Sequence, residues 1–254
     1  MPPLLSPELD SLLEARHHDP FAWLGRHPLP DGLVIVRALL PDTVRVEIVE
    51  ANAATTLVMA RVGQTDLFEW RGSAPSVPAH YRLRVLKGNG QASEGFDPYC
   101  FGPQLDEGQI SAFNGGHHNA AHQFLGAHPW QVDGIAGMRF AVWAPNAGRV
   151  SVVGDFNRWD GRCHPMRVRG ASGVWELFIP GLTEGLYKYE LRNRHSGALR
   201  LKTDPFAREY ELRPSTASRF RPAGEFQWQD DAWLAQRRAR DWLRSDRSFR
   251  HSEL

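Results

Sequence analysis

The sequence repeats itself, and this repeat constrains the fold more than any other feature. The segment LGRHP at residues 24–28 recurs as LGAHP at 125–129, an offset of 101 residues. Further pairs follow in the same order: Pro41 and Pro145, Tyr81 and Tyr187, and DPY at 97–99 with DPF at 204–206. Short motifs recur by chance, but an ordered series with a slowly growing offset indicates an internal repeat. We therefore predict two tandem copies of one domain of about 100 residues.

Hydrophobic and polar residues alternate within each copy. Trp175, Leu177 and Ile179 form one such row, and Tyr187 and Tyr189 begin another. A period of two indicates strands with one buried face, and Pro, Gly, Asn and Asp separate the strands. Short strands in units of this size predict an all-β protein made of two tandem immunoglobulin-like β-sandwiches. Among the tryptophans, we expect Trp143 and Trp175 to lie in the core.

Short helical segments are expected at both ends of the chain. Ser6 caps a helix that runs to Arg16, and a second helix runs from Asp230 to Arg244. The second helix is basic and amphipathic, as membrane-surface helices are, but we favour a linker helix whose Trp233 and Trp242 pack on a neighbouring domain. The predicted organisation is a first sandwich at 1–113, a linker at 114–123, a second sandwich at 124–222 and a linker with a helical tail at 223–254.

Composition excludes several classes of protein. The 30 basic and 29 acidic residues leave a formal charge of +1, so we expect neither a nucleic-acid nor a membrane partner. The chain contains no apolar run of 18 residues, and its first residues do not form a secretory signal. Its two cysteines, Cys100 and Cys163, fit a reducing compartment rather than a disulfide scaffold. We therefore expect a cytoplasmic location.

Two sets of motifs resemble known families. The second copy carries GDFNRWD at 154–160, GLYKY at 185–189 and KTDP at 202–205, a set that resembles the starch- and glycogen-associated carbohydrate-binding modules of α-amylase-type enzymes. The first copy carries HHDPFAWLGRH at 17–27 and FDPYCFGP at 96–103, and it resembles the amino-terminal domain of bacterial 1,4-α-glucan (glycogen) branching enzymes. Together these resemblances cover most of the chain, from about residue 12 to about residue 242. They imply a non-catalytic amino-terminal part of such an enzyme.

Sugar-binding chemistry can be assigned to three residues of the second copy. The apolar face of a glucose ring stacks on an aromatic ring, while its hydroxyl groups need polar partners at the rim. Trp159 lies in a loop just after a strand, next to Asn157, and Lys188 should point outward between two buried tyrosines. We therefore name Trp159, Lys188 and Asn157 as candidate carbohydrate-binding residues. The alternatives are a Trp159 that folds back over the sandwich end and a Lys188 that is only a solvated cation.

The sequence departs from the strongest glycan binders of this module type. Those modules carry a second stacking aromatic residue in the hairpin after the Tyr-Lys-Tyr strand, where this chain has HSGAL at 195–199. In the first copy, Ala53 stands at the position of Trp159 and Arg82 at that of Lys188. A two-ring clamp is therefore absent at this hairpin of the second copy, and Trp159 alone is expected to bind weakly. The first copy is expected to be structural or regulatory rather than a sugar binder through this face.

No catalytic residue can be named in this chain. Branching enzymes use a retaining carboxylate pair in a (β/α)8 barrel of about 250 residues, and this chain shows no βα alternation. We therefore expect no branching activity from this chain alone, no cofactor and no metal. The loose histidine cluster is interpreted as a polar linker: His117, His118, His122 and His128.

Three functional hypotheses follow. The first is that the chain holds α-1,4-glucan or glycogen near the catalytic barrel of the same enzyme, and so influences the length of chain that is transferred. The second is that the sandwiches only brace that barrel. The third is a free-standing glycogen-binding regulator, which the missing second aromatic disfavours.

Overall fold

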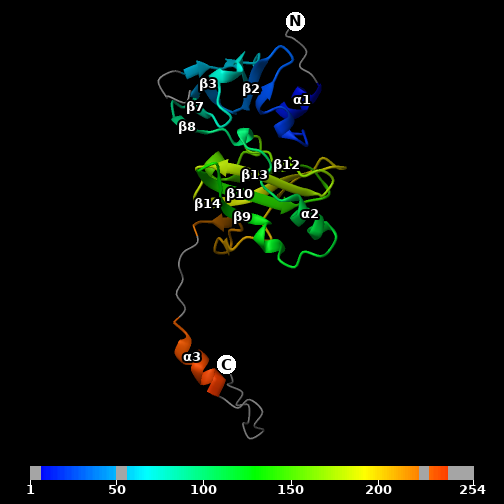
Figure 1. Ribbon diagram of the computed structural model, residues 1–254, viewed down its shortest axis with the longest axis vertical. Helices are drawn as coiled ribbons and strands as arrows, with labels where there is room; N and C mark the ends of the chain where they lie inside the picture. Colours follow the sequence, from blue (N-terminus) through cyan, green and yellow to red (C-terminus); the bar gives the residue numbers. More distant parts are fainter. Residues whose placement is uncertain (1–6, 50–55, 223–228, 240–254) are drawn as a thin grey trace. The chain divides into compact units, whose positions relative to one another are not determined.

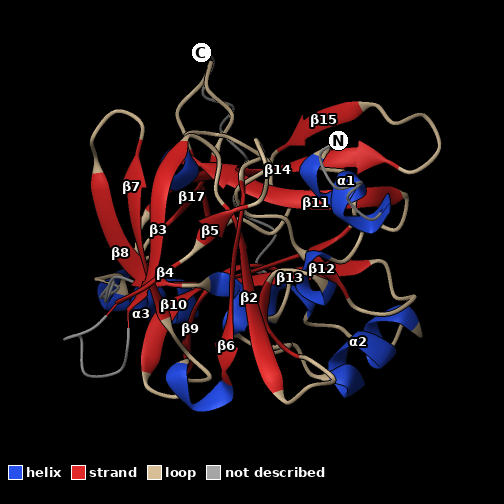
Figure 2. Ribbon diagram, turned by 90° about the horizontal axis from the view of Figure 1, so that it is seen from above, coloured by secondary structure: helices blue, strands red, loops and turns tan. Residues whose placement is uncertain are grey.

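The computed structural model describes residues 7–49, 56–222 and 229–239. The chain divides into two compact units, Met1–Pro222 and Ala223–Leu254. The first unit holds both sandwiches, and strands dominate it (Figures 1 and 2). Its strand pairs are all antiparallel, which confirms the predicted all-β class.

The first sandwich consists of two four-stranded sheets. One sheet has the order β1 (Gly25–Pro28), β2 (Leu33–Leu39), β6 (Leu67–Ser73), β5 (Ala60–Arg61). The other has the order β4 (Thr56–Val58), β3 (Thr43–Val49), β7 (Arg82–Lys87), β8 (Ala92–Phe96). Alternate residues of the central strands face inward, so Val36, Ile48 and Phe68 are buried in one shared core.

The second sandwich follows the same plan. One sheet has the order β12 (Arg167–Val168), β13 (Val174–Pro180), β10 (Ile135–Trp143), β9 (Gly126–Val132). The other has the order β11 (Ala147–Gly154), β14 (Gly185–Asn193), β17 (Ser218–Phe220), β16 (Glu209–Tyr210), and β15 (Leu199–Lys202) also pairs with β14. Phe140, Trp175, Tyr187 and Tyr189 fill the space between the sheets. Trp175 is 1% exposed, which confirms its predicted place in the core.

Trp143 is the exception among the predicted core residues. Its side chain is 51% exposed, so the prediction that it lies in the core is wrong. Phe140 and Val142 point into the sandwich, and the alternation of the strand turns Trp143 to the opposite face at the end of β10. The indole there contacts the ring of Phe113 edge-on, with 5.9 Å between the ring centroids.

The described helices are short. They are α1 (Pro7–Leu13), α2 (Glu107–Asn114) and α3 (Asp231–Ala239), with 3-10 turns η1 (Pro20–Ala22), η2 (Ala74–Ser76), η3 (Pro98–Cys100), η4 (Ala121–Gln123) and η5 (Asp155–Asn157). The terminal helices α1 and α3 confirm the expected helical ends, although the proposed cap Ser6 and the tail residue Trp242 lie outside the described residues. Helix α3 exposes Trp233 within its own unit.

Helix α2 is an element that the sequence analysis missed. Asp106 caps it by accepting a hydrogen bond from the Gln109 amide at 3.0 Å. Ile110 of this helix is buried with Phe124 and Leu125, so the helix packs on the second sandwich.

The two sandwiches share an apolar contact. Leu24 and Tyr99 of the first copy belong to the same buried cluster as Phe140 and Trp175 of the second. The Tyr99 hydroxyl donates a hydrogen bond to the Pro165 carbonyl at 3.1 Å. Because side chains of both copies meet in one buried cluster, the junction is a packed interface.

Candidate functional site

The predicted sugar-binding loop begins where β11 ends. Asn157, at the end of η5, is buried, and its Oδ1 accepts a hydrogen bond from the Gly154 amide at 2.9 Å. Its Nδ2 donates to the Val152 carbonyl at 2.9 Å and lies 2.9 Å from His164 Nδ1. The amide of Asn157 is therefore fully used inside the loop. This side chain shapes the loop rather than facing solvent.

The loop then turns through the left-handed region of backbone space. Arg158 and Trp159 have φ angles of 55° and 61°. Non-glycine residues adopt such angles at a cost, and they persist where surrounding contacts hold them. Here the Trp159 amide donates to the Gly154 carbonyl at 3.0 Å, which closes the turn.

Trp159 is half-buried in this turn. Its Nε1 donates a hydrogen bond to Asp155 Oδ1 at 3.1 Å. Part of the side chain thus rests on the protein, and the remaining part is accessible to a ligand.

Lys188 lies on the outward face of β14. Its neighbours Tyr187 and Tyr189 are fully buried, as the alternation predicted. Lys188 pairs in register with Val153, and its Nζ donates to Thr216 Oγ1 at 2.8 Å. Gly154, to which the Trp159 turn is bonded, pairs with Tyr187. The structure therefore brings the Trp159 loop and the Lys188 strand to adjacent positions of one sheet.

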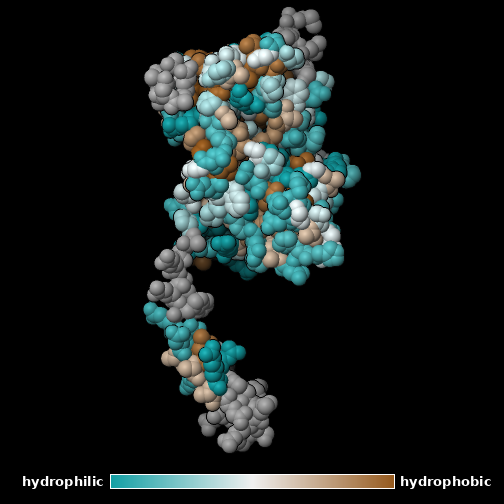
Figure 3. All heavy atoms as spheres, viewed as in Figure 1, coloured by the Kyte–Doolittle hydropathy of each residue, from teal (hydrophilic) through white to brown (hydrophobic). Residues whose placement is uncertain are grey.

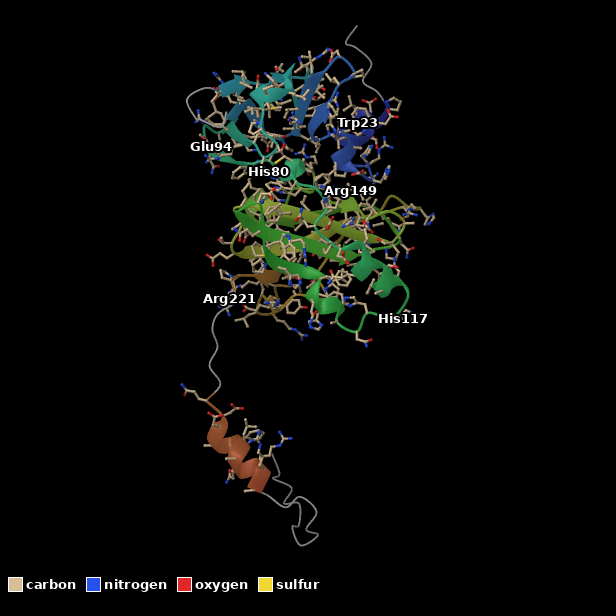
Figure 4. The ribbon with its side chains drawn as sticks, in the orientation of Figure 1. Trp23, His80, Glu94, His117, Arg149 and Arg221 are labelled. Carbon is tan, nitrogen blue, oxygen red and sulfur yellow. The ribbon has the colours of Figure 1, made fainter. Side chains whose placement is uncertain are left out.

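Buried Arg149 fixes the far end of the loop (Figure 4). Its Nη1 donates to the Gly161 carbonyl at 2.7 Å, and its Nη2 is ion-paired with Glu190.

His164, which contacts Asn157, carries no charge at pH 7. Burial lowers the pKa of its ring to about 4.

The first sandwich also holds this loop, which sequence reasoning did not foresee. Arg158 Nη2 lies 2.9 Å from Asp42 Oδ2, and Arg162 Nη1 lies 3.4 Å from Asp66 Oδ2. Exposed pairs of this kind contribute at most about 1 kcal/mol each. They orient the loop more than they stabilise the fold.

The hairpin between β14 and β15 presents no tryptophan, tyrosine or phenylalanine. Asn193 Oδ1 accepts hydrogen bonds from the amides of His195 and Ser196, both at 2.9 Å. Leu199 is exposed at the start of β15. The position Ala53, matched to Trp159 in the first copy, lies outside the described residues.

The histidines considered as a metal cluster make structural contacts instead. His128 Nε2 lies 2.9 Å from the Leu125 carbonyl oxygen, and the ring of His118 contacts Phe124. In the described part of the chain, no three His, Cys, Asp or Glu side chains are placed to share a metal ion. Across the same residues, no helix has the length and hydropathy needed to span a bilayer.

The second antiparallel sandwich, with its tryptophan loop at a strand end, has the architecture of a carbohydrate-binding module. Residues 124–207 match carbohydrate-binding module 48 (isoamylase N-terminal domain), and residues 6–99 match the N-terminal domain of the alpha-1,4-glucan branching enzyme GlgB. The chain thus carries two domains that match the non-catalytic N-terminal region of 1,4-alpha-glucan branching enzymes.

Relatives from several bacteria share this region. The 1,4-alpha-glucan branching enzyme GlgB of Methylococcus capsulatus is 50% identical over 94% of this chain and 32% of the relative. That of Cellvibrio japonicus is 47% identical over 96% of this chain and 34% of the relative. The chain therefore spans about a third of the length of these relatives. The PulA structure from Klebsiella pneumoniae covers 78% of this chain at 16% identity, with a TM-score of 0.34.

Proposed function

We propose that this region of a branching enzyme binds α-1,4-glucan through Trp159 and Lys188. The half-buried indole belongs to a turn that is bonded to Gly154, one register step from the residue paired with Lys188, and this placement carries the proposal. The ring offers a stacking surface for a glucosyl residue, and the ammonium group is placed to bond its hydroxyls. Asn157 contributes by shaping the loop.

The proposed role in the whole enzyme follows from this binding. The parent reaction would transfer an α-1,4-glucan segment to a 6-hydroxyl group in a catalytic barrel, and the sandwiches would hold the long donor chain nearby. The described residues contain no parallel βα units that could build a barrel. We therefore expect no new α-1,6 links when amylose is incubated with this chain alone.

The proposed location is the cytoplasm. A role in glycogen metabolism and the two free cysteines both support this location.

Native-gel retardation in glycogen tests the binding site. Loss of one stacking ring removes about 1–2 kcal/mol, so Trp159→Ala should raise the dissociation constant about tenfold. Trp143→Ala is the matched control, since it removes an exposed indole elsewhere on the same sandwich. Equal retardation of the wild type and both variants would place binding outside this loop.

A bracing role is the second candidate, and exposed apolar side chains favour it. Leu199 and Leu201 lie on the edge strand β15. Tyr210 lies on β16 and Leu212 just after it, on the same side of β14 as β15. Exposed side chains as large and apolar as leucine and tyrosine are common at protein interfaces. A wild-type chain that is not retarded by glycogen would support bracing over binding.

The domain boundaries are part of the proposal. We keep a first sandwich at 1–113, a connection at 114–123, a second sandwich at 124–222 and a tail at 223–254. Helix α2 falls at the end of the first range, although its Ile110 packs on Phe124 of the second sandwich.

A further inference from the structure

A cleft of about 540 Å³ lies between the two sandwiches, and neither Trp159 nor Lys188 lines it. Its volume is within the range of pockets that hold small ligands, about 300–1,000 Å³. Hydrophobic side chains show at the level where the sandwiches meet (Figure 3), and His80 lies at this junction (Figure 4).

The first sandwich supplies one wall of the cleft. Arg82 of β7 pairs in register with Phe96 of β8, so both side chains lie on the same face. The guanidinium carbon of Arg82 lies 5.9 Å from the centre of the Phe96 ring. Arg82 Nη2 is also 2.9 Å from Glu94 Oε1. An aromatic ring and an ion pair therefore stand side by side on this wall.

The second sandwich supplies the opposite wall. Phe156 comes from the Trp159 loop, His164 from the segment that follows it, and residues 179–182 from the end of β13 and the next turn. Phe156 contacts the ring of His164, with 5.6 Å between the centroids. This wall is mostly apolar, and its histidine is neutral at pH 7.

The repeat relates this cleft to the sugar-binding face of the second copy. Arg82 follows Tyr81 as Lys188 follows Tyr187, so Arg82 stands at the position of the outward lysine. Phe96 precedes Asp97 as Thr203 precedes Asp204. The first copy thus has a ring beside its cation, where the second copy has a threonine.

We propose that this cleft is a second binding site for a segment of α-1,4-glucan. The inference rests on the proposed function, because it extends glucan binding from the Trp159 loop to the junction of the two copies. Phe96 and Phe156 match the apolar C–H faces of glucosyl rings, and Arg82 and Glu94 match the hydroxyl groups.

Charge favours a neutral polyhydroxylated ligand over an anion. Arg82 is paired with Glu94, which it shares with Arg84, and Arg84 also lies 3.7 Å from Glu47. Arg82 and Glu94 together offer both hydrogen-bond donors and acceptors. The neutral His164 ring adds no positive charge to the cleft. A phosphate or acidic peptide would find no unpaired cation among the lining residues.

Chemical-shift mapping on the 254-residue chain with maltoheptaose tests the proposal, and cellohexaose serves as the β-linked control. We expect the amides of Gly95 and Gly181 to shift with maltoheptaose only, in addition to the Trp159 indole. Arg82→Ala should weaken binding measured at the cleft amides about five- to tenfold, because a hydrogen bond to a charged group is lost. Arg84→Ala is the matched control: Arg84 also pairs with Glu94 and is equally exposed, but it does not line the cleft. This variant should bind within twofold of the wild type.

The outcomes separate this inference from the proposed function. Shifts at the Trp159 indole without shifts at Gly95 and Gly181 would overturn the cleft site and leave the Trp159 site standing. Equal effects of Arg82→Ala and Arg84→Ala would also overturn it. Cleft shifts that persist in Trp159→Ala would support the cleft as a separate site. No shifts at either place would overturn both.

Discussion

The Tyr187 hydroxyl donates a hydrogen bond to Asp204 Oδ2 at 2.6 Å, and both residues are fully buried. The first copy repeats this contact between Tyr81 and Asp97. In each copy the aspartate also accepts from the amide two residues later, Tyr99 or Phe206. Tyr81 directly precedes β7, and Tyr187 lies in β14. Each tyrosine thus ties its strand to the Asp-Pro turn later in the same copy, which explains why these residues recur together in the sequence.

The two copies should differ in their dependence on this hydroxyl. Tyr81→Phe removes the donor to Asp97 Oδ2, whereas in Tyr187→Phe the Tyr189 hydroxyl remains 3.2 Å from Asp204 Oδ2. We expect Tyr81→Phe to lower the free energy of unfolding by about 2 kcal/mol and Tyr187→Phe by about 1 kcal/mol. Urea unfolding measures both losses. Tyr210→Phe is the comparison at the surface, because it removes a hydrogen bond from a half-exposed tyrosine to the Asp204 carbonyl oxygen at 3.0 Å. Equal losses in the two buried variants would contradict the expectation.

The repeated glycine is a second point of identity between the copies. Gly25 and Gly126 have φ angles of +89° and +101°, and a Cβ on Gly25 would overlap the Tyr99 carbonyl oxygen. We expect Gly25→Ala to lower the free energy of unfolding by about 2 kcal/mol or more, because strain and overlap add. At Gly126 the Cβ would stand 3.0 Å from the Phe206 carbonyl oxygen, so the loss should be smaller.

Thermal unfolding of Gly102→Ala provides the matched control for these variants. Gly102 has open space around its Cβ position and no positive φ. This substitution should leave the unfolding midpoint unchanged or raise it slightly. A loss at Gly102 as large as that at Gly25 would show that neither the strain nor the overlap is responsible.

The predictable parts of the fold are those that depend on short, local sequence motifs. Glycine at the strand entry, Asp-Pro at the turn and the buried tyrosine recur at nearly constant spacing, so the two sandwiches followed from the repeat. Helix α2 was missed because its packing depends on Phe124 and Leu125, which belong to the other sandwich. Trp143 was misplaced because the alternation that buries Val142 turns its neighbour outward at the strand end.

The site was predictable only in part, for a related reason. The outward direction of Lys188 followed from the alternation with Tyr187 and Tyr189, and the structure agrees. The clamp between Arg158 and Asp42 is a tertiary contact, so the sequence carried no signal for it. The bonds of Asn157 are local, but they depend on the backbone path of the turn, which the residue types alone do not give. The wall made by Arg82 and Phe96 likewise depends on strand register and on the packing of one sandwich against the other.

Asp97 should make stability fall as pH rises. Burial raises the pKa of Asp97 to about 6, above its ordinary value of 3.8, so the folded state holds this proton more tightly than the unfolded state. Its stabilising contribution is complete below about pH 4 and is lost as the pH rises through about 6. The shift corresponds to a loss of at most about 3 kcal/mol, which Asp97→Asn should abolish.

His164 acts with the opposite sign in the same range. Burial lowers its pKa to about 4, so the unfolded state binds this proton more tightly and stability rises from about pH 4 to about pH 6.5. Urea unfolding of Asp97→Asn and the wild type across this range isolates the aspartate, because His164 is common to both. Parallel pH profiles of the two proteins would contradict the assignment.

Glu176 joins the buried end of the second sandwich to the segment that leads into α2. Its Oε1 lies 2.8 Å from Arg169 Nη1, and its Oε2 accepts from the Leu105 amide at 2.8 Å. Both side chains of the ion pair are buried, so Glu176→Gln leaves the Arg169 charge poorly compensated. We expect a loss of about 3 kcal/mol in the free energy of unfolding.

Glu107→Gln separates this buried pair from a surface effect. Glu107 also pairs with Arg169, but its side chain is 79% exposed, so its loss should cost less than about 1 kcal/mol. Hydrogen exchange adds a local measurement, because releasing Leu105 should speed exchange at the Ile110 amide in Glu176→Gln only. Equal losses in the two variants would mean that Arg169 is stabilised through its exposed partner, and that the buried carboxylate does not hold α2 on the sandwich.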